Sequence, residues 1–405
     1  MGNKYLIVAD DFTGSNDTGV QMRKRGIQVE VTLFPDAEIE IESMVLDTES
    51  RNIPAESAYK KVKDMTSKVM SQNTFDIVFK KIDSTLRGNV VAEIKALDDV
   101  YGATKVIFAP AFPKINRITE DGIHKLNGIR LMETEMVRDP LSPITTDNIV
   151  TLLEKGYNEK VNHHTLNEIR TGKIDVTEGK FHTFDVTETR DLQLIADSIL
   201  KLDEKILWVG SAGLANSIFD ILYPQYPAMA VVGSISETSF KQINYAEEKG
   251  VPIVQLKAED IINETNHQNY IDRILSLIRE GKDLILTATR ARADYEYSIR
   301  YAKEKAGLSN IETSRYVQRY LSSVTKQVLL KTELSGIFLT GGDTAIAVIE
   351  QMKASGCAIQ VELMPGIVLS KLVGGEKENL SIISKAGAFG VEKDLFECLG
   401  KIKEK

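Results

Sequence analysis

The sequence predicts an α/β protein of two domains, each built on a mostly parallel sheet with flanking helices. Its 405 residues exceed one typical domain. Short apolar runs, such as residues 6–9 (LIVA) and 206–209 (ILWV), alternate with helical stretches, a pattern typical of parallel sheets covered by helices. Two nearby prolines, Pro224 and Pro227, interrupt this alternation and indicate a linker. We therefore expect domains at 1–227 and 228–405, with the active site in the interdomain cleft.

Composition excludes several classes of protein. The formal net charge of -8 argues against nucleic acid as a partner, because phosphate backbones require clustered Lys and Arg. No apolar run approaches the ~20 residues of a membrane helix, and the residues before the first strand do not predict a signal peptide. The two cysteines, Cys357 and Cys398, are isolated. Isolated cysteines predict reduced thiols and a cytoplasmic location.

The first motif, ADDFTGSND at residues 9–17, directly follows the first strand. Ligands of open α/β sheets bind at the carboxyl ends of the strands. Asp10 and Asp11 at this position would accept hydrogen bonds from hydroxyl groups or act as a general base. We expect a helix from about Thr18 to Arg25 after this motif. The alternative is that Asn16 or Asp17 only caps this helix and that Asp10 and Asp11 are solvated turn residues.

A second polar turn, KKIDSTLRGN at residues 80–89, also follows an apolar strand. Arg binds a carboxylate through two hydrogen bonds, and Ser and Asn bind hydroxyl groups. The alternative is a capping box with a surface Arg. Arg51 follows a predicted strand at 44–46; alone it would be a surface ion pair, but here it shares the sheet edge with both motifs. The residues predicted to bind substrate are Asp10, Asp11, Arg51, Lys81, Ile82, Asp83, Ser84, Arg87 and Asn89.

Glycine-containing turns follow several strands of the second half. Gly residues let backbone N–H groups approach phosphates at a helix N-terminus. The sequence contains neither a GxxxxGK[ST] loop nor a GxGxxG fingerprint, and its five His residues lack zinc spacing, so no metal ligands are assigned. Asp343 would hold Mg²⁺ or cap the helix. The residues predicted to bind the nucleotide cofactor are Ser234, Ser236, Gly341, Gly342, Asp343, Thr344, Gly366 and Gly387.

Residues 112–143 are rich in charge, Gly and Pro and show little periodicity. A connection of this length in a compact domain is usually functional. We therefore expect a long functional loop between two elements of the first domain.

Together these motifs resemble the four-carbon acid sugar kinase family. They are 9–17, 81–89, 121–124 (DGIH), 138–140 (RDP), 210–213 (GSAG), 341–344 (GGDT) and 365–366 (PG), in order over nearly the whole chain. The resemblance implies that the first domain binds a sugar acid through Asp11, Arg51 and residues 81–84. It implies that the second binds ATP through Ser234 or Ser236, residues 341–344 and Gly387. The chain departs from the family pattern at 367–369 (IVL), where another Pro and a Gly or basic turn are more usual.

The resemblance implies transfer of the γ-phosphoryl group of ATP to the terminal hydroxyl of a four-carbon acid, with Mg²⁺ bridging the phosphates. Segment 15–19 (SNDTG) is similar to the D-threonate kinase branch, whereas the erythronate branch carries Ala in place of Ser15. Arg51, Lys81 and Arg87 are the expected cations for the carboxylate, and Asp11 and Asp83 the expected bases.

Several alternatives remain open. The acid could be D-erythronate or 4-hydroxy-L-threonine instead of D-threonate. A protein of another class would be a non-catalytic sugar-acid sensor, or an aldolase or dehydrogenase that acts on the same acids. We expect small-molecule partners, no nucleic acid and no membrane, and we allow for a homodimer.

Overall fold

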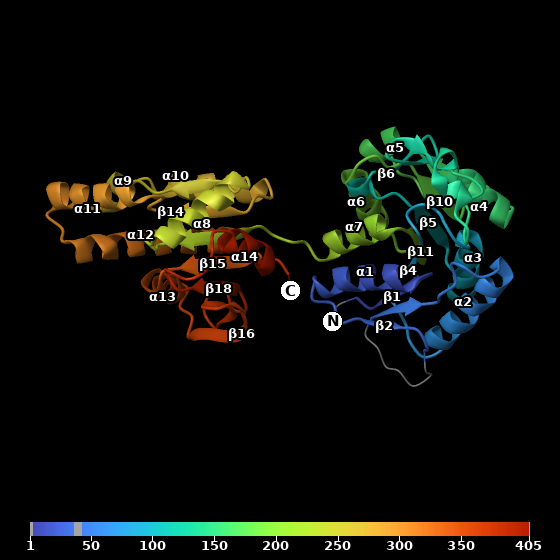
Figure 1. Cartoon of the computed structure of the whole chain (residues 1–405), viewed down its shortest axis with the longest axis horizontal. Helices are drawn as coiled ribbons and strands as arrows, with labels where there is room; N and C mark the ends of the chain where they lie inside the picture. Colours follow the sequence, from blue (N-terminus) through green and yellow to red (C-terminus); the bar gives the residue numbers. More distant parts are fainter. Residues whose placement is uncertain (1–2, 36–42, 405) are drawn as a thin grey trace. The chain divides into compact units, whose positions relative to one another are not determined.

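The computed structural model describes residues 3–35 and 43–404. The chain divides into two compact units, Met1–Pro224 and Gln225–Lys405 (Figure 1). This division precedes the expected boundary at 227/228, and two hydrogen bonds explain the difference. Ser335 donates through Oγ to the carbonyl of Tyr226 at 2.6 Å and through its backbone N–H to the carbonyl of Pro227 at 3.0 Å. Tyr226 and Pro227 therefore belong to the second unit.

The first unit is built on an eight-stranded sheet in which every pair of neighbours is parallel. From the first strand, the chain adds strands first toward one edge of the sheet and then toward the other, as in doubly wound folds. In spatial order the strands are β2 (Glu30–Thr32), β3 (Met44–Asp47), β1 (Tyr5–Ala9), β4 (Ile77–Lys81), β11 (Ile206–Gly210), β5 (Lys105–Ala109), β10 (Phe181–Phe184) and β9 (Val161–His164).

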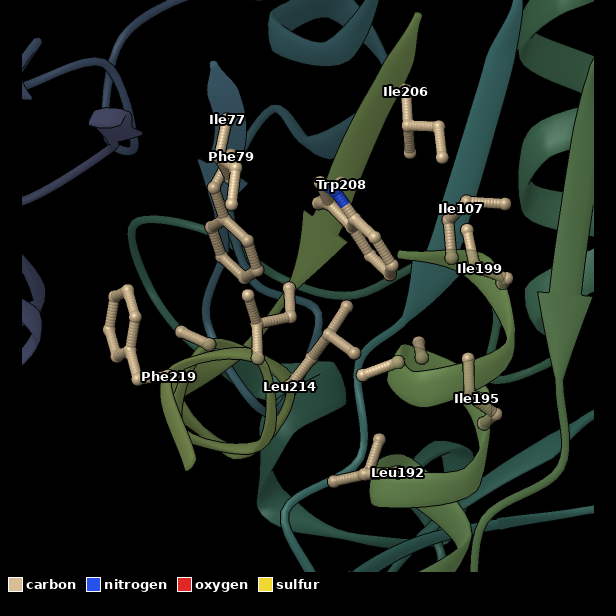
Figure 2. Packing of buried hydrophobic residues seen from close by; sticks show 14 of the residues in the cluster. Ile77, Phe79, Ile107, Leu192, Ile195, Ile199, Ile206, Trp208, Leu214 and Phe219 are labelled. Carbon is tan, nitrogen blue, oxygen red and sulfur yellow. The ribbon is translucent and has the colours of Figure 1, made fainter. Parts of the chain in front are cut away.

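Helices cover both faces of this sheet, because its strands are apolar on both sides. In β1, Tyr5 and Ile7 face one core and Leu6 and Val8 face the other. Figure 2 shows Trp208 of β11 packed against side chains of α6 and α7 in the first core. Each such buried side chain contributes about 1.5–3 kcal/mol. The helices are α1 (Phe12–Arg23), α2 (Ala55–Met70), α3 (Val90–Tyr101), α4 (Ile149–Tyr157), α5 (Leu166–Arg170), α6 (Thr189–Ile199) and α7 (Ala212–Leu222).

The segment expected to be a long loop instead forms a small antiparallel sheet. Its strands are β6 (Arg117–Glu120), β7 (Ile123–Leu126) and β8 (Ile129–Arg130). The two connections, Asp121–Gly122 and Asn127–Gly128, have positive φ at all four residues, as two-residue hairpin turns require. Short 3₁₀ helices flank the sheet at η1 (Pro113–Ile115), η2 (Leu131–Glu133) and η3 (Glu135–Arg138).

The second unit is built on a seven-stranded mixed sheet. Five of its strands are parallel, and the last two continue the sheet as an antiparallel hairpin. In spatial order they are β13 (Ile253–Gln255), β14 (Leu284–Thr287), β12 (Ala228–Val232), β15 (Gly336–Thr340), β18 (Ser381–Lys385), β17 (Ile367–Val373) and β16 (Gly356–Met364).

Two cores again enclose the parallel strands. Met229 and Val231 of β12 face a core shared with α10, α12 and α13, whereas Ala230 and Val232 face a core shared with α8 and α14. No helix within the described ranges is long and apolar enough to cross a membrane. The helices are α8 (Glu237–Glu248), α9 (Ala258–Ile262), α10 (His267–Arg279), α11 (Arg292–Ala306), α12 (Asn310–Lys331), α13 (Gly342–Gln351) and α14 (Asp394–Ile402).

Candidate active site

The strand ends of the first unit bring its predicted polar residues together. Ala9 of β1 pairs with Asp47 of β3 on one side and with Lys81 of β4 on the other. Because the strands are parallel, the residues that follow them emerge at one edge of the sheet. The Asp10–Asp11 turn, the loop that carries Arg51 and the turn after Lys81 therefore share one site.

Arg51 connects the two carboxylates of the first motif. Its Nε and Nη2 donate to Asp10 Oδ2 and Oδ1 at 2.7 and 3.0 Å, and its Nη1 donates to Asp11 Oδ2 at 2.9 Å. Burial lowers the pKa of Arg51, but the hydrogen bonds and charge of Asp10 outweigh it and raise that pKa above its usual range. Gly88, with a φ of 95°, packs closely against this cluster. A Cβ at this position would be 3.0 Å from Arg51 Cγ.

Asp11 is the N-cap of α1, and its Oδ1 accepts a hydrogen bond from Gly14 N at 3.1 Å. The helix therefore begins at Phe12, and the sequence-based expectation of a start near Thr18 with a cap at Asn16 or Asp17 is wrong. Asp17 is exposed in the second turn of the helix. The Ser15 hydroxyl is buried and donates to the Asp11 carbonyl, so it is fully engaged within the helix.

Lys81 places a buried ammonium group beside the first turn of α1. Its side chain is 6% exposed, and its Nζ donates to the carbonyl of Ile82 at 3.2 Å. A Cβ added at Gly14 would lie 2.6 Å from Asp11 Oδ1 and 3.0 Å from this Nζ, so both groups lie close to the backbone of α1 at this position. Burial lowers the pKa of Lys81, although the nearby carboxylates of Asp10 and Asp11 oppose that shift. An ammonium has three donors, and an anion bound here would use the remaining ones.

Asp83 is held by Arg87 within the same turn. Arg87 Nε and Nη2 donate to Asp83 Oδ2 and Oδ1 at 2.9 and 3.2 Å, and Arg87 Nη1 reaches Asp139 Oδ2 at 3.3 Å. Burial raises the pKa of Asp83, but hydrogen bonds from Arg87 and Thr85 outweigh it and hold that pKa well below its usual range. A carboxylate so strongly stabilised in its charged form accepts protons poorly.

The other predicted residues of this turn have different surroundings. The Ile82 side chain lies in the hydrophobic core, so only its backbone faces the site. Asn89 donates its side-chain amide to the carbonyls of Ser50 and Ile53 at 2.9 and 2.7 Å. It therefore fixes the loop that carries Arg51. Ser84 is half-buried, and its carbonyl lies 2.9 Å from His124 Nε2.

His124 is a supporting residue of this site whose role the sequence left open. It is fully buried, and its Nδ1 lies 2.9 Å from Thr119 Oγ1. Because the Ser84 carbonyl can only accept, Nε2 carries the proton in this arrangement. Burial lowers the pKa of His124 to about 4. The neutral imidazole thus fixes the backbone of Ser84 from the antiparallel sheet.

The second unit contains a pocket of about 450 Å³ at its own sheet edge. Val232 of β12 pairs with Thr287 of β14 and with Thr340 of β15, so the turns that follow these strands meet there. Six of the predicted nucleotide residues line this pocket: Ser234, Ser236, Gly341, Gly342, Asp343 and Thr344.

Glycine at three positions gives this pocket its shape. Gly341 has a φ of 97° and precedes α13 as its N-cap residue. A Cβ at Gly342 would meet nothing within 4 Å, so this residue borders open space. A Cβ at Gly233 would lie 1.9 Å from Thr344 Oγ1, so glycine is required for β12 to pack against α13. The arrangement leaves the N-terminus of a helix open toward the pocket, as anion sites require.

Gly387 and Gly366 do not line this pocket. The Gly387 carbonyl accepts hydrogen bonds from the hydroxyls of Ser236 and Ser239 at 2.7 and 3.1 Å, and it thereby holds the serine turn. Gly366 lies in the turn between β16 and β17, where an added Cβ would be 2.5 Å from the Phe389 ring.

The sequence did not identify the wall of the pocket that α11 and α12 form. These helices are separated from the glycine turns along the chain, and their amphipathic pattern gives no signal for binding. The wall combines apolar and polar side chains: Arg292, Tyr295, Ser298, Ile299, Thr313, Ser314, Val317 and Gln318.

Comparisons with known proteins match each half of the chain to a described domain. Residues 5–218 match the family model of a sugar-binding N-terminal domain, and residues 229–395 match that of a nucleotide-binding C-terminal domain. A D-threonate kinase of Salmonella typhimurium is 33% identical, and the alignment covers 99% of both chains. A D-erythronate kinase of Heliobacterium modesticaldum is 24% identical, with coverage of 96% of this chain and 94% of the relative.

A solved structure has the same fold over nearly the full length. It is a Bordetella bronchiseptica protein, crystallised with bound citrate as a domain-swapped dimer, with 26% identity, a TM-score of 0.61 and 99% coverage of both chains. The family models together span most of the chain, and the first relative exceeds 30% identity over almost all of it. This chain belongs to the four-carbon acid sugar kinase family.

Proposed function

We propose that this protein is an ATP-dependent kinase that phosphorylates the terminal hydroxyl of a four-carbon sugar acid, and that D-threonate is its substrate. The observation that carries the proposal is the polar edge of the first unit, where Lys81 and the first turn of α1 can receive a carboxylate. The relative with 33% identity is a D-threonate kinase, which supports this choice of acid.

Lys81 is the cation that we assign to the acid's carboxylate. The guanidinium groups of Arg51 and Arg87 already donate to Asp10, Asp11, Asp83 and Asp139. Lys81 has one hydrogen bond, to a carbonyl, and so retains donors for a ligand. An anion would also favour the charged ammonium, whose pKa burial has lowered.

Asp11 is the general base that we propose. Asp83, the other expected base, has a pKa held well below its usual range, so it accepts a proton poorly at neutral pH. Asp11 is one quarter exposed, whereas Asp10 is almost fully buried under Arg51. Deprotonation of the acceptor hydroxyl contributes less than positioning in phosphoryl transfer, since the transition state is loose.

The pocket of the second unit is the site that we assign to ATP. The open N-terminus of α13 suits the phosphates, and the wall from α11 and α12 suits the base and sugar. Mg²⁺ would bridge and neutralise the phosphates. The described residues contain no cluster of three His, Cys, Asp or Glu side chains able to hold a metal ion. Exposed Asp343 is the carboxylate that fits Mg²⁺ at this pocket.

ADP release with ATP and Mg²⁺ tests the proposal across D-threonate, D-erythronate, L-threonate and 4-hydroxy-L-threonine. D-threonate should give the highest kcat/KM, with the phosphate on the terminal oxygen by phosphorus NMR. Acid binding without ADP release would indicate a sensor, and turnover without ATP would indicate an aldolase or dehydrogenase. A higher kcat/KM for D-erythronate would make D-erythronate the substrate instead of D-threonate, within the same family.

We propose a cytoplasmic homodimer as the working form of the enzyme. Support comes from the dimer of the Bordetella bronchiseptica relative, and from Cys357 and Cys398, which are free thiols. The edge strand β16 also exposes apolar side chains, with Ile359 and Val361 76% and 48% exposed. Analytical ultracentrifugation checks this, and a monomer at micromolar concentration contradicts it.

A further inference from the structure

A buried ion pair lies next to the loop that carries Arg51. Lys80 Nζ and Glu93 Oε2 are 2.8 Å apart, and their side chains are 0% and 1% exposed. Lys80 precedes the substrate turn on β4, and Glu93 lies in the first turn of α3. Neither side chain reaches solvent, so neither is a candidate to touch the acid. Their position nevertheless links two elements that frame the site.

Hydrogen bonds connect this ion pair to the Arg51 loop. The Ser50 hydroxyl donates to Glu93 Oε1 at 2.7 Å, and Thr48 Oγ1 lies 2.7 Å from Ser50 Oγ. Thr48 Oγ1 also lies 2.6 Å from the carbonyl of Ala9, at the end of β1, so its single proton is shared between that carbonyl and Ser50 Oγ. Both hydroxyl side chains are fully buried. The chain of contacts therefore runs from the ion pair, through the residue that precedes Arg51, to the start of the Asp10–Asp11 turn.

Stability alone does not account for such a pair. Two charges removed from water lose solvation, and replacement of a buried ion pair by apolar residues is often neutral or stabilising. What the pair does here is hold one carboxylate oxygen in a fixed place, because Lys80 binds Oε2 and leaves Oε1 for Ser50. A fixed acceptor fixes the Ser50 side chain, and thereby the backbone from which Arg51 extends.

We propose that Glu93, fixed by Lys80, is a positioning residue that orients Arg51 through the Ser50 hydroxyl. Arg51 must place three donors on two carboxylates at once, and a loop displaced by a fraction of an ångström would lose that geometry. The inference rests on the proposed function, in which the Asp10–Arg51–Asp11 cluster shapes the acid site. It assigns to Lys80, Glu93 and Ser50 a role that none of them performs by contact with substrate.

Ser50→Ala tests the link with the smallest change. The variant should keep its fold, as reported by the fluorescence of the single Trp, Trp208, which is buried in the core of the same unit. We expect the KM for the acid to rise about tenfold, the cost of one hydrogen bond to a charged group. We expect kcat and the KM for ATP to remain within about twofold, because the site is displaced rather than removed.

Ser217→Ala is the matched control. Ser217 is a buried serine of the same unit whose hydroxyl donates to the backbone carbonyl of Gly213 at 3.0 Å. Its removal costs one buried hydrogen bond, here to a neutral carbonyl, but touches none of the contacts described above. Equal kinetics of the two variants would overturn the inference, as would a parallel rise of both KM values in Ser50→Ala.

Two double variants separate the acceptor from the charge. Lys80→Met with Glu93→Gln keeps an oxygen for Ser50 but loses the ammonium that fixes it, so the KM for the acid should rise less than in Ser50→Ala. Lys80→Met with Glu93→Leu removes the oxygen and should reproduce Ser50→Ala. An identical KM in both double variants would overturn the inference. A wild-type enzyme that phosphorylates none of the four-carbon acids would instead refute the proposed function itself.

Discussion

Arg51 binds Asp10 through two parallel hydrogen bonds, Nε to Oδ2 at 2.7 Å and Nη2 to Oδ1 at 3.0 Å. Paired donors of this kind fix the plane of the guanidinium as well as its position. Since the third donor goes to Asp11, the cation and both carboxylates form one rigid unit before any ligand arrives. The cluster is thus a preformed wall of the acid site, and Lys81 is the group left to neutralise the ligand.

This relationship predicts that Arg51→Lys will damage the acid site although it conserves the charge. A lysine ammonium cannot reproduce the planar fork on Asp10. We expect kcat/KM for the acid to fall about 100-fold, which equals roughly 2.7 kcal/mol, while the KM for ATP changes little. Steady-state kinetics with each substrate varied in turn measure both. Arg190→Lys, at an exposed position of α6, should change neither value, and an equal loss for both substrates would contradict the prediction.

Two glycines of the second unit should respond in opposite ways. Gly342→Val adds a side chain whose Cβ meets no protein atom within 4 Å and that enters the pocket, so we expect normal folding and an ATP affinity at least about tenfold weaker. Gly233→Ala collides with Thr344 and should instead destabilise the fold by about 1–3 kcal/mol. Calorimetric titration and thermal unfolding distinguish the two, and unchanged ATP affinity in Gly342→Val would place the nucleotide elsewhere.

Conversion to the amide should have different effects on the enzyme at Asp11 and at Asp83. Asp11→Asn retains an oxygen to cap α1 but loses its basicity, so we expect kcat to fall by about 10²-fold, the lower end of the usual contribution of a general base. Asp83→Asn leaves Arg87 with Asp139 but without the charge of Asp83, and we expect a lower melting temperature and a higher KM for the acid. Rapid-quench measurement of the transfer step separates these effects. A larger loss of kcat in Asp83→Asn would reverse the two roles.

The fold and the polar edge of the first unit could be predicted because both depend on local sequence. Apolar runs that end in Asp10, Arg51 and Lys81 put these residues at one edge once the strands are parallel. The start of α1 was misplaced because Asn16 and Asp17 are also residue types that cap helices, whereas the cap in this structure is Asp11. The Asp121–Gly122 and Asn127–Gly128 pairs are typical of hairpin turns and could have predicted both hairpins. The many charged residues around them led instead to the expectation of a loop.

What the sequence could not supply is contact between distant segments. The amphipathic patterns of α11 and α12 predict helices but not that Tyr295 and Gln318 line a pocket. The pairing of Lys80 with Glu93 requires β4 and α3 to be placed against each other. The same holds for His124, whose role depends on a carbonyl forty residues away at Ser84.

His124 predicts a specific loss of stability in mild acid. Burial lowers its pKa to about 4, so between the usual value of 6.5 and about 4 the unfolded chain binds a proton that the folded one does not. The contribution of His124 to the free energy of unfolding should therefore be fully present above pH 6.5. Below pH 6.5 the free energy of unfolding should decrease, by at most about 1.4 kcal/mol per pH unit for one proton. Urea unfolding followed by Trp208 fluorescence at pH 7 and pH 5 reports on this unit alone, since the chain has one Trp.

His124→Gln isolates that proton, because glutamine can still donate to the Ser84 carbonyl but does not titrate. The variant should lose less stability than the wild type between pH 7 and pH 5. His182, whose pKa burial also lowers to about 4, contributes equally to both proteins and cancels in the comparison. His267→Gln, in the second unit, should leave the Trp208 transition unchanged. Equal acid sensitivity of His124→Gln and the wild type would show that His124 takes up its proton without loss of the Ser84 contact.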